Sequence, residues 1–169
     1  MTGRAVGAEA GDLELGGSGA AGGEGTWFVD SSVLLCVVYG SSAKATAWFD
    51  GVRARGERLV ASRMLRLEVL RSVLNKEVAG IIKPGALDAG AFLAEFDTMP
   101  ITPMLLDDAE TLAQPLGGAD AIHLASALFY GSDNATFVTH DRQQARAARN
   151  LGMAVHDPVT DDPILPPVC

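Results

Sequence analysis

The sequence predicts an α/β domain, a three-layer sandwich in which a mostly parallel sheet of about five strands is flanked by helices. Short apolar runs of strand type alternate along the chain with segments that have helical spacing of apolar residues. This alternation is typical of βαβ units, whose strands pair in parallel beneath helices on both faces. The 169 residues, 48% of them apolar and 20% charged, are enough for one domain with a full core.

The two ends of the chain differ in composition from its body. Residues 1–25 are mainly Gly and Ala with scattered acids and no apolar period, so we expect a disordered tail. Residues 158–169 are Pro-rich and are expected to form a C-terminal tail. The folded domain is therefore predicted at 26–157. Its Cys36 and the terminal Cys169 form no disulfide framework.

The sequence also bears on location. The apolar run 33–38 is far shorter than the ~20 residues that a membrane helix needs. The N-terminal region has a single basic residue, Arg4, and lacks the layout of a signal peptide. We therefore expect a cytoplasmic protein that does not contact a membrane.

The first half of the domain is expected to alternate between strand and helix. An apolar strand, 26–30, ends on an acid, and the hydroxyls of Ser31 and Ser32 are suited to cap a helix that runs to residue 38. A helix at 43–55 with Trp48 and Phe49 on its buried side follows, and then a strand at 58–62.

The long helix predicted at 62–78 carries two apolar arcs on its surface. One arc contains Leu67, Leu70, Leu74 and Val78, and the other contains Leu65, Val69 and Val73. Between them lies a narrow polar stripe of Glu68, Arg71, Ser72 and Asn75. Two apolar walls around such a stripe favour a helix that lines a groove, whereas the alternative is a solvated face with an ordinary Glu68–Arg71 pair.

The second half continues the alternation. We expect a helix at 86–97, a strand at 100–105 that Pro103 confines to an edge, and a helix at 107–116 with Asp107 and Asp108 in its first turn. The helix at 120–130 is apolar on nearly every side, as buried helices are. A strand at 135–139, a helix at 142–151 and a short strand at 153–155 complete the domain.

Four acids stand out as candidates for a functional site. Asp30 and Asp141 each follow a strand, so both are expected at the same edge of a parallel sheet. Asp120 at a helix start and Glu68 on its polar stripe could reach that edge. At about 4 Å and an effective dielectric constant of about 20, each close pair of carboxylates costs about 4 kcal/mol. A hard cation, Mg²⁺ or Mn²⁺, would relieve this repulsion, and phosphodiester hydrolysis is the chemistry that most needs such a site.

Each of these acids also has a structural alternative. Asp30 could be a cap, Asp120 could be a first-turn acid, and Asp141 has the capping-box spacing to Gln144. His123, one turn after Asp120, is expected to be a hydrogen-bonded structural histidine, although its spacing would also permit metal ligation.

The net charge of −8 does not exclude a nucleic-acid substrate. Part of that charge belongs to the N-terminal tail and part to the four candidate acids, which leaves a nearly neutral body with local basic patches. The basic series runs along Arg53, Arg55, Arg58, Arg63, Arg66, Arg71 and Lys76. Which arginines contact a substrate stays open, the candidates being Arg53, Arg55, Arg58, Arg71, Arg142 and Arg146.

Four pieces of the sequence together resemble the acidic motifs of PIN-domain ribonucleases. They are Phe-Val-Asp30-Ser-Ser, Glu68 within its long helix, Ala-Asp120-Ala-Ile-His-Leu-Ala and Val-Thr-His-Asp141-Arg. The likeness is greatest to the VapC-type toxins of type II toxin–antitoxin pairs, and it extends over residues 26–157. Gly117-Gly118 before Asp120 and the long N-terminal tail depart from the usual pattern, but neither removes an acid.

The resemblance implies a PIN-like fold and Mg²⁺-dependent endonucleolytic cleavage of RNA, with Mn²⁺ as a possible substitute. It implies that Asp30 and Asp120 are the main metal ligands and that Glu68 and Asp141 complete the site. Ser31 and Thr139 match supporting polar positions beside the acids. It further implies a homodimer that a cognate antitoxin neutralises at the acidic groove.

Two functions of other classes remain possible at this stage. A phosphoacceptor module also places an Asp after its first strand, but position 32 is Ser32 where a dehalogenase-like site needs a second Asp. A receiver-like site needs an acidic pair before that strand and a late Lys, and neither is evident. The other possibility is a catalytically silent PIN fold that binds a partner protein.

Overall fold

The computed structural model describes residues 25–160 and 166 of the chain. The tail predicted at 1–25 therefore lies outside the described residues except for Gly25. The C-terminal tail predicted at 158–169 is described only at 158–160 and 166, and Cys169 lies outside.

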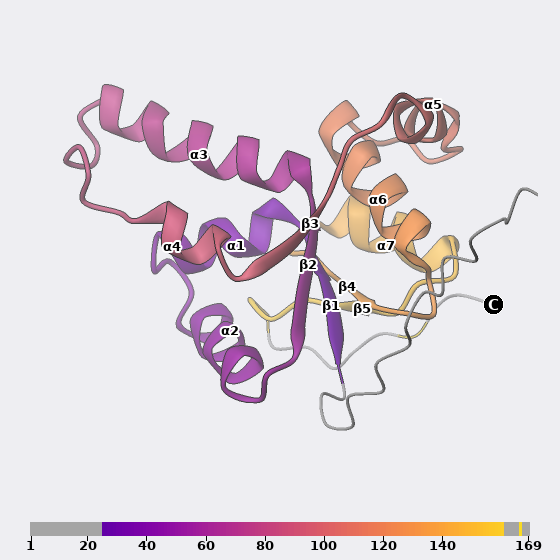
Figure 1. Cartoon of the computed structure of the whole chain (residues 1–169), viewed down its shortest axis with the longest axis horizontal. Helices are drawn as coiled ribbons and strands as arrows, with labels where there is room; N and C mark the ends of the chain where they lie inside the picture. The colour runs from indigo at the N-terminus through magenta and orange to yellow at the C-terminus, as the bar shows by residue number, and fades with distance from the viewer. Residues whose placement is uncertain (1–24, 161–165, 167–169) are drawn as a thin grey trace, which may run out of the picture.

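A parallel sheet of five strands forms the centre of the molecule, as predicted (Figure 1). The strands are β1 (Thr26–Val29), β2 (Arg58–Ser62), β3 (Phe96–Met99), β4 (Thr136–Val138) and β5 (Val155–His156). Their order across the sheet is β3-β2-β1-β4-β5, and each neighbouring pair is parallel. The chain thus moves outward from β1 to one side through β2 and β3 and then returns to extend the sheet on the other side.

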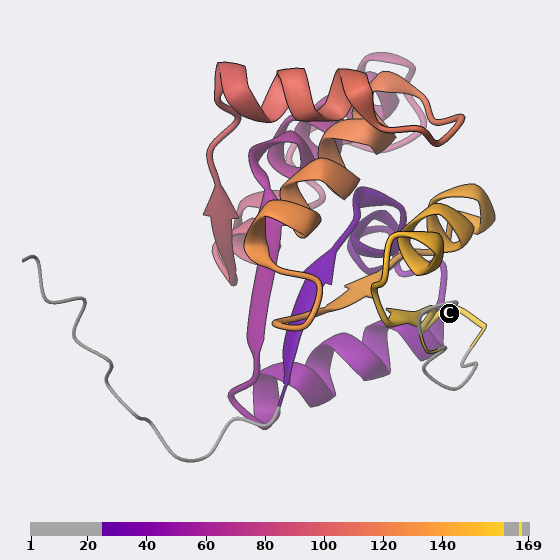
Figure 2. The same cartoon turned by 90° about the vertical axis from the view of Figure 1, so that its right-hand side faces the viewer.

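Seven helices cover the two faces of this sheet in the described part of the chain. They are α1 (Ser31–Val38), α2 (Ala43–Ala54), α3 (Arg63–Val78), α4 (Ala89–Leu93), α5 (Pro103–Thr111), α6 (Gly118–Tyr130) and α7 (Arg142–Asn150). Helices α1 to α4 pack on one face, and α6 and α7 pack on the other. Helix α5 lies on the outer side of α6 (Figure 2). The result is the expected three-layer α/β sandwich.

The sheet separates two hydrophobic cores, the first beneath α1 to α4 and the second beneath α6 and α7. Alternate residues of the central strands enter one core or the other. Val29 of β1 packs among α1, α2 and α3, whereas Phe28 packs against α6 and α7. In β2, Leu59 and Ala61 share the first core and Val60 belongs to the second. Both faces of a central parallel strand are buried, which is why these segments read as unbroken apolar runs rather than as alternating ones.

The prediction was wrong about the third strand and its neighbours. The strand lies at 96–99, where a helix end was expected, and pairs through Phe96 and Leu59 at the sheet edge. The predicted helix 86–97 shrinks to α4, which Asp88 caps. Pro103 is the first residue of α5, with Thr102 as its cap, because proline fits the first helical turn, where its missing N–H is not needed. Asp107 and Asp108 consequently lie in the interior of α5 and not in its first turn.

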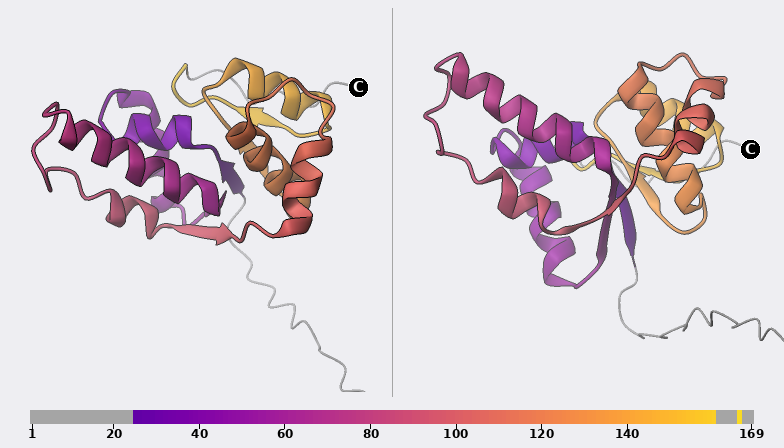
Figure 3. Two further views of the ribbon diagram at one scale, coloured as in Figure 1. Left: turned by 90° about the horizontal axis from the view of Figure 1, so that it is seen from above. Right: turned by 45° about the horizontal axis from the view of Figure 1, so that its top comes forward.

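The outer apolar arc of α3 is not packed into either core of the described chain. Leu65, Val69 and Val73 are buried, as expected. Leu67, Leu70, Leu74 and Val78 are 39% to 81% exposed. Helix α3 projects beyond the sheet together with the loop that leads to α4 (Figures 1 and 3). The chain therefore presents an apolar stripe, made of these four side chains, to its surroundings.

The order of the strands places a topological switch point between β1 and β4. Crossover connections leave these two strands toward opposite sides of the sheet, so their carboxyl ends border a crevice. Asp30 directly follows β1, and Thr139 directly follows β4. The backbone N–H of Asp30 donates to the carbonyl of Val138 over 2.9 Å, which fixes the two strand ends side by side.

No helix within residues 25–160 combines the length and the apolar character that crossing a bilayer requires.

Candidate active site

Asp30 is the most buried of the four acids. Its side chain is 2% exposed, and its Oδ2 accepts hydrogen bonds from the Ser32 N–H (3.2 Å), the Ser32 hydroxyl (2.6 Å) and the Thr139 hydroxyl (3.1 Å). Asp30 itself is the N-cap of α1, so the predicted capping by Ser31 and Ser32 was wrong. With Oδ2 held by three donors, Oδ1 is the oxygen directed at the other candidate residues.

Asp120 lies in the first turn of α6, which begins at Gly118 with Gly117 as its N-cap, two residues before the predicted start of the helix. Its Oδ1 accepts a hydrogen bond of 2.7 Å from Nε2 of Gln144. The same Nε2 lies 3.4 Å from Oδ1 of Asp30. One amide group therefore connects the acid that follows β1 with the acid that begins α6.

Glu68 reaches the same region from α3 through a buried histidine. Oε2 of Glu68 is 2.6 Å from Nε2 of His123, which is also 3.6 Å from Oδ1 of Asp30. The other ring nitrogen, Nδ1, is 3.1 Å from the hydroxyl of Ser62. His123 is fully buried with partners at both nitrogens, which confirms the interpretation as a hydrogen-bonded structural histidine.

Asp141 stands at the outer side of the group and caps α7. Its Oδ1 accepts from the N–H groups of Gln143 (2.7 Å) and Gln144 (2.8 Å). Its own N–H donates to the hydroxyl of Thr139, which in turn donates to Asp30. Thr139 thus ties the loop that carries Asp141 to the buried acid, while the Ser31 side chain contributes to lowering the pKa of Glu68.

The pKa values of Asp120 and Glu68 are shifted in opposite directions. Burial raises the pKa of Asp120, and the charges of Asp30 and Asp141 raise it further against the hydrogen bond from Gln144. Burial also acts to raise the pKa of Glu68, but the hydrogen bond and charge of His123 outweigh it and leave that pKa below its ordinary value. For His123, desolvation is outweighed in the same way by Glu68 and Asp30, and its pKa is raised. A nearby cation would therefore stabilise the charged form of Asp120.

The residues fit a hard cation chemically, although their side chains do not form a finished cage. Within residues 25–160 and 166, no group of three or more His, Cys, Asp or Glu side chains is close enough to hold a metal ion. Instead, His123 and Gln144 lie between the acids. The oxygens available are Asp30 Oδ1, the carboxylate of Asp120 and the buried Gln144 Oε1, which has no hydrogen-bond partner in the described chain. An all-oxygen set of this kind suits Mg²⁺ or Mn²⁺.

Two residues of this site, Ser32 and Gln144, were not among the predicted ones. Ser32 was predicted as a helix cap and not as a residue of the acidic site, yet its hydroxyl donates to Asp30 and accepts from the His140 N–H. Gln144 was considered only as the partner of Asp141 in a capping box, but its side chain turns inward. Gln144 lies on the same helix face as Ala147 and Ala148, which are both buried. A polar residue on that apolar face was the signal that could have indicated an inward-pointing side chain.

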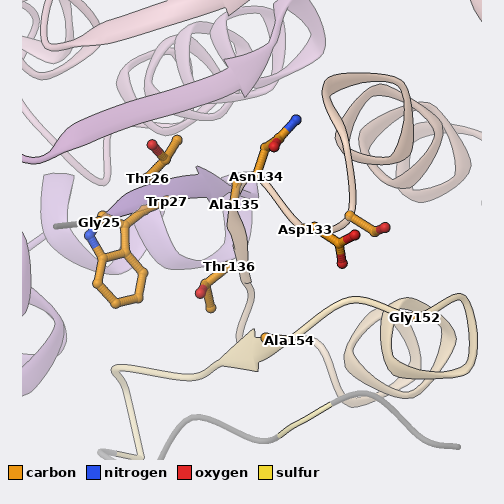
Figure 4. Close-up of a pocket in the computed structure, with 10 residues that line it drawn as sticks. Gly25, Thr26, Trp27, Asp133, Asn134, Ala135, Thr136, Gly152 and Ala154 are labelled. Carbon is orange, nitrogen blue, oxygen red and sulfur yellow. The ribbon is translucent and has the colours of Figure 1, made fainter. Parts of the chain in front are cut away.

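A separate hollow of about 470 Å³ opens at the opposite end of the sheet, beside the amino ends of β1 and β4 (Figure 4). None of the four candidate acids lines it. The residues around it are Gly25, Thr26, Trp27, Ser132, Asp133, Asn134, Ala135, Thr136, Gly152 and Ala154. This hollow is therefore not part of the carboxylate site.

A five-stranded parallel sheet with acids gathered at its β1/β4 switch point defines the class of protein. The sequence profile of the PIN domain matches residues 27–150, so the chain belongs to the PIN-domain family. The chain is 38% identical to Ribonuclease VapC46 of Mycobacterium tuberculosis (strain ATCC 25618 / H37Rv) over 133 residues. These residues are 78% of this chain and 96% of that relative. Within the family it is thus a VapC-type protein.

Two solved structures share the fold at low sequence identity. One is VapBC2 from Rickettsia felis, bound to a DNA fragment from the promoter of VapBC2. Its TM-score is 0.57 at 12% identity, and the match covers 78% of this chain and 98% of that chain. The other is PAE2754 from Pyrobaculum aerophilum, with a TM-score of 0.51, 19% identity, and coverage of 80% and 85%. These likenesses support the architecture alone.

Proposed function

We propose that this protein is a cytoplasmic toxin that cleaves RNA endonucleolytically with Mg²⁺, or with Mn²⁺ in its place. The observation that carries the proposal is the convergence of Asp30, Glu68 and Asp120 on one buried hydrogen-bond network, with Asp141 beside it, in a chain of the VapC type. The related protein is a ribonuclease by name, and the overlap extends over nearly all of its length.

In this proposal, each acidic side chain has a specific role in binding the cation or the attacking water. Asp30 and Asp120 hold the cation, with Ser32 and Thr139 orienting Asp30 through its Oδ2. Glu68 and Asp141 complete the acidic site and position the attacking water. When bound, Mg²⁺ supplies charge neutralisation for the phosphate and activation of water. Burial of Asp30 keeps its carboxylate in a region of low dielectric, where such charge interactions are strong.

The exposed apolar stripe of α3 supports the proposal that the protein binds other proteins. Leu67, Leu70, Leu74 and Val78 form a row along one helix, and each of them is 39% to 81% exposed in the described chain. Rows of this kind are typical of surfaces that another protein buries. We propose that a second copy of the chain and a cognate antitoxin use this side of the molecule, which would bring the antitoxin to the acidic groove beside Glu68.

A catalytically silent PIN fold that only binds a partner is the second candidate. The apolar stripe of α3 favours it as much as it favours the toxin. The raised pKa of Asp120 favours the enzyme, because an acid kept among other acids at a cost to stability is typical of functional sites. Membership of the PIN-domain family sets aside the phosphoacceptor alternative.

Expression in a cell that lacks the antitoxin separates the two candidates. If the protein is an enzyme, we expect its expression to arrest growth and Asp120→Ala to abolish the arrest. Asp50→Ala, on the exposed surface of α2, should still arrest growth. If the protein is a catalytically silent binding partner, we expect either no growth arrest or an arrest that Asp120→Ala leaves unchanged. Equal protein levels of the three forms, measured on immunoblots, complete the comparison.

A further inference from the structure

Gln144 occupies an unusual place for a residue in the first turn of a helix. Its backbone N–H donates to the capping Asp141, as in any capped helix. Its side chain, however, does not return to the backbone of Asp141. It is 1% exposed and points into the crevice between β1 and α6.

One end of this amide joins two acids. Nε2 donates to Asp120 over 2.7 Å and lies 3.4 Å from Asp30. Asp30 and Asp120 are 90 positions apart in the sequence and come from different elements, yet a single NH₂ group spans them. A neutral donor between two carboxylates reduces their repulsion and fixes their separation.

The other end of the amide has no partner. Oε1 is buried and accepts no hydrogen bond within the described part of the chain. A buried carbonyl oxygen without a donor is costly, and native structures rarely retain one without a function. Rotation about the last side-chain bond exchanges Nε2 and Oε1. Oε1 would then face Asp30 and Asp120 and would repel the two ionised carboxylates unless a cation shared the three oxygens.

We infer that Gln144 is a further metal-site residue, which holds Asp30 and Asp120 through Nε2 while no cation is bound and, after rotation of its amide, offers Oε1 as a neutral oxygen ligand to the divalent cation. Amide oxygens accompany carboxylates in the sites of hard cations. The inference rests on the proposed function, because it needs the cation that the ribonuclease needs.

The experiment is a titration of the purified full-length protein with Mn²⁺ alone, in which electron paramagnetic resonance measures the free ion. Gln144→Leu removes both ends of the amide, and Gln144→Glu keeps an oxygen ligand but removes the donor. Gln143→Leu is the matched control, since Gln143 is the preceding residue of the same turn but is exposed and donates to the carbonyl of Pro115. Thermal melting by circular dichroism precedes each titration, and Gln144→Met replaces the leucine variant if that variant does not fold.

We expect Gln144→Leu to weaken Mn²⁺ binding by about 10–100-fold. We expect Gln144→Glu to bind Mn²⁺ at least as tightly as the unchanged protein, and Gln143→Leu to match it. Unchanged affinity in Gln144→Leu would overturn the inference, and so would an equal loss in Gln144→Glu, which would limit Gln144 to the donor role. If the unchanged protein binds no Mn²⁺, the proposed cation site fails together with this inference, a result that is distinct from the failure of Gln144 alone.

Discussion

Glu68 and His123, 55 positions apart on α3 and α6, are joined by a hydrogen bond of 2.6 Å between Oε2 and Nε2. The imidazole is fully buried and is anchored on its other side by the Ser62 hydroxyl. Ser62 in turn accepts from the N–H of Met64 as the cap of α3. The position of Glu68 at the crevice therefore depends on a chain of bonds that starts at the end of β2.

This pair should make stability depend on pH within a definite window. The pKa of Glu68 is lowered from 4.5, so its stabilising effect is present above that value and is lost as the pH falls through the folded pKa. The pKa of His123 is raised from 6.5, so its effect is present below that value and is lost as the pH rises through the folded pKa. The pair is thus most stabilising between about pH 4.5 and 6.5.

We predict that His123→Ala lowers the free energy of unfolding by about 3 kcal/mol at pH 5.5, as breaking a buried pair does. The loss should be smaller at pH 9, because a rise in pH favours the neutral imidazole in the unchanged protein and so weakens its pairing with Glu68. Urea denaturation in the presence of a chelator measures both values. A loss of the same size at the two pH values would show that only the volume of the imidazole matters.

Asp141 has two roles that substitution can separate. Asp141→Ala removes the cap of α7 and should lower the free energy of unfolding by about 1 kcal/mol, whereas Asp141→Asn keeps a good cap. If the carboxylate also serves the acidic site, Asp141→Asn should retain stability and still lose RNA cleavage. Urea denaturation and a cleavage assay on both variants provide the comparison. Full cleavage by Asp141→Asn would leave Asp141 as a helix cap only.

The exposed stripe of α3 should matter for assembly and not for folding. Leu70→Lys and Leu74→Lys place a charge on side chains that are 39% and 44% exposed, so we expect a change of less than about 0.5 kcal/mol in unfolding free energy. We expect the same variants to turn a dimer into a monomer in sedimentation velocity. Asn75→Lys, which adds the same charge on the exposed polar stripe of the helix, is the control. A monomeric unchanged protein, or a dimer in all variants, would contradict a dimer interface on α3.

The sequence predicted the architecture because buried parallel strands leave a strong pattern. The runs that became β1, β2 and β4 are short and apolar, and the switch point follows from their order. β3 has no such pattern, since Asp97 and Thr98 on this edge strand are exposed. Pro103 then gave a misleading signal, because it was interpreted as a strand residue where it begins a helix.

The site was only partly accessible from the sequence. Acids that follow strands can be placed at one edge by topology alone, as Asp30 and Asp141 were. Gln144 is neutral, and its spacing from Asp141 already had a sufficient explanation in helix capping. The α3 stripe could not be interpreted fully either, because periodicity identifies an apolar face but not whether the same chain or another one buries it.

Cleavage of a single-stranded RNA by the purified protein with Mg²⁺ tests the central claim most directly. We predict cleavage that a chelator abolishes, and a rate in Asp30→Asn that is lower by at least about 100-fold, as expected when a group that stabilises developing charge is removed. Asp50→Asn, a change of the same type at a side chain that is 65% exposed, should cleave at the unchanged rate. Normal Mg²⁺-dependent cleavage by Asp30→Asn would contradict the assignment of the site.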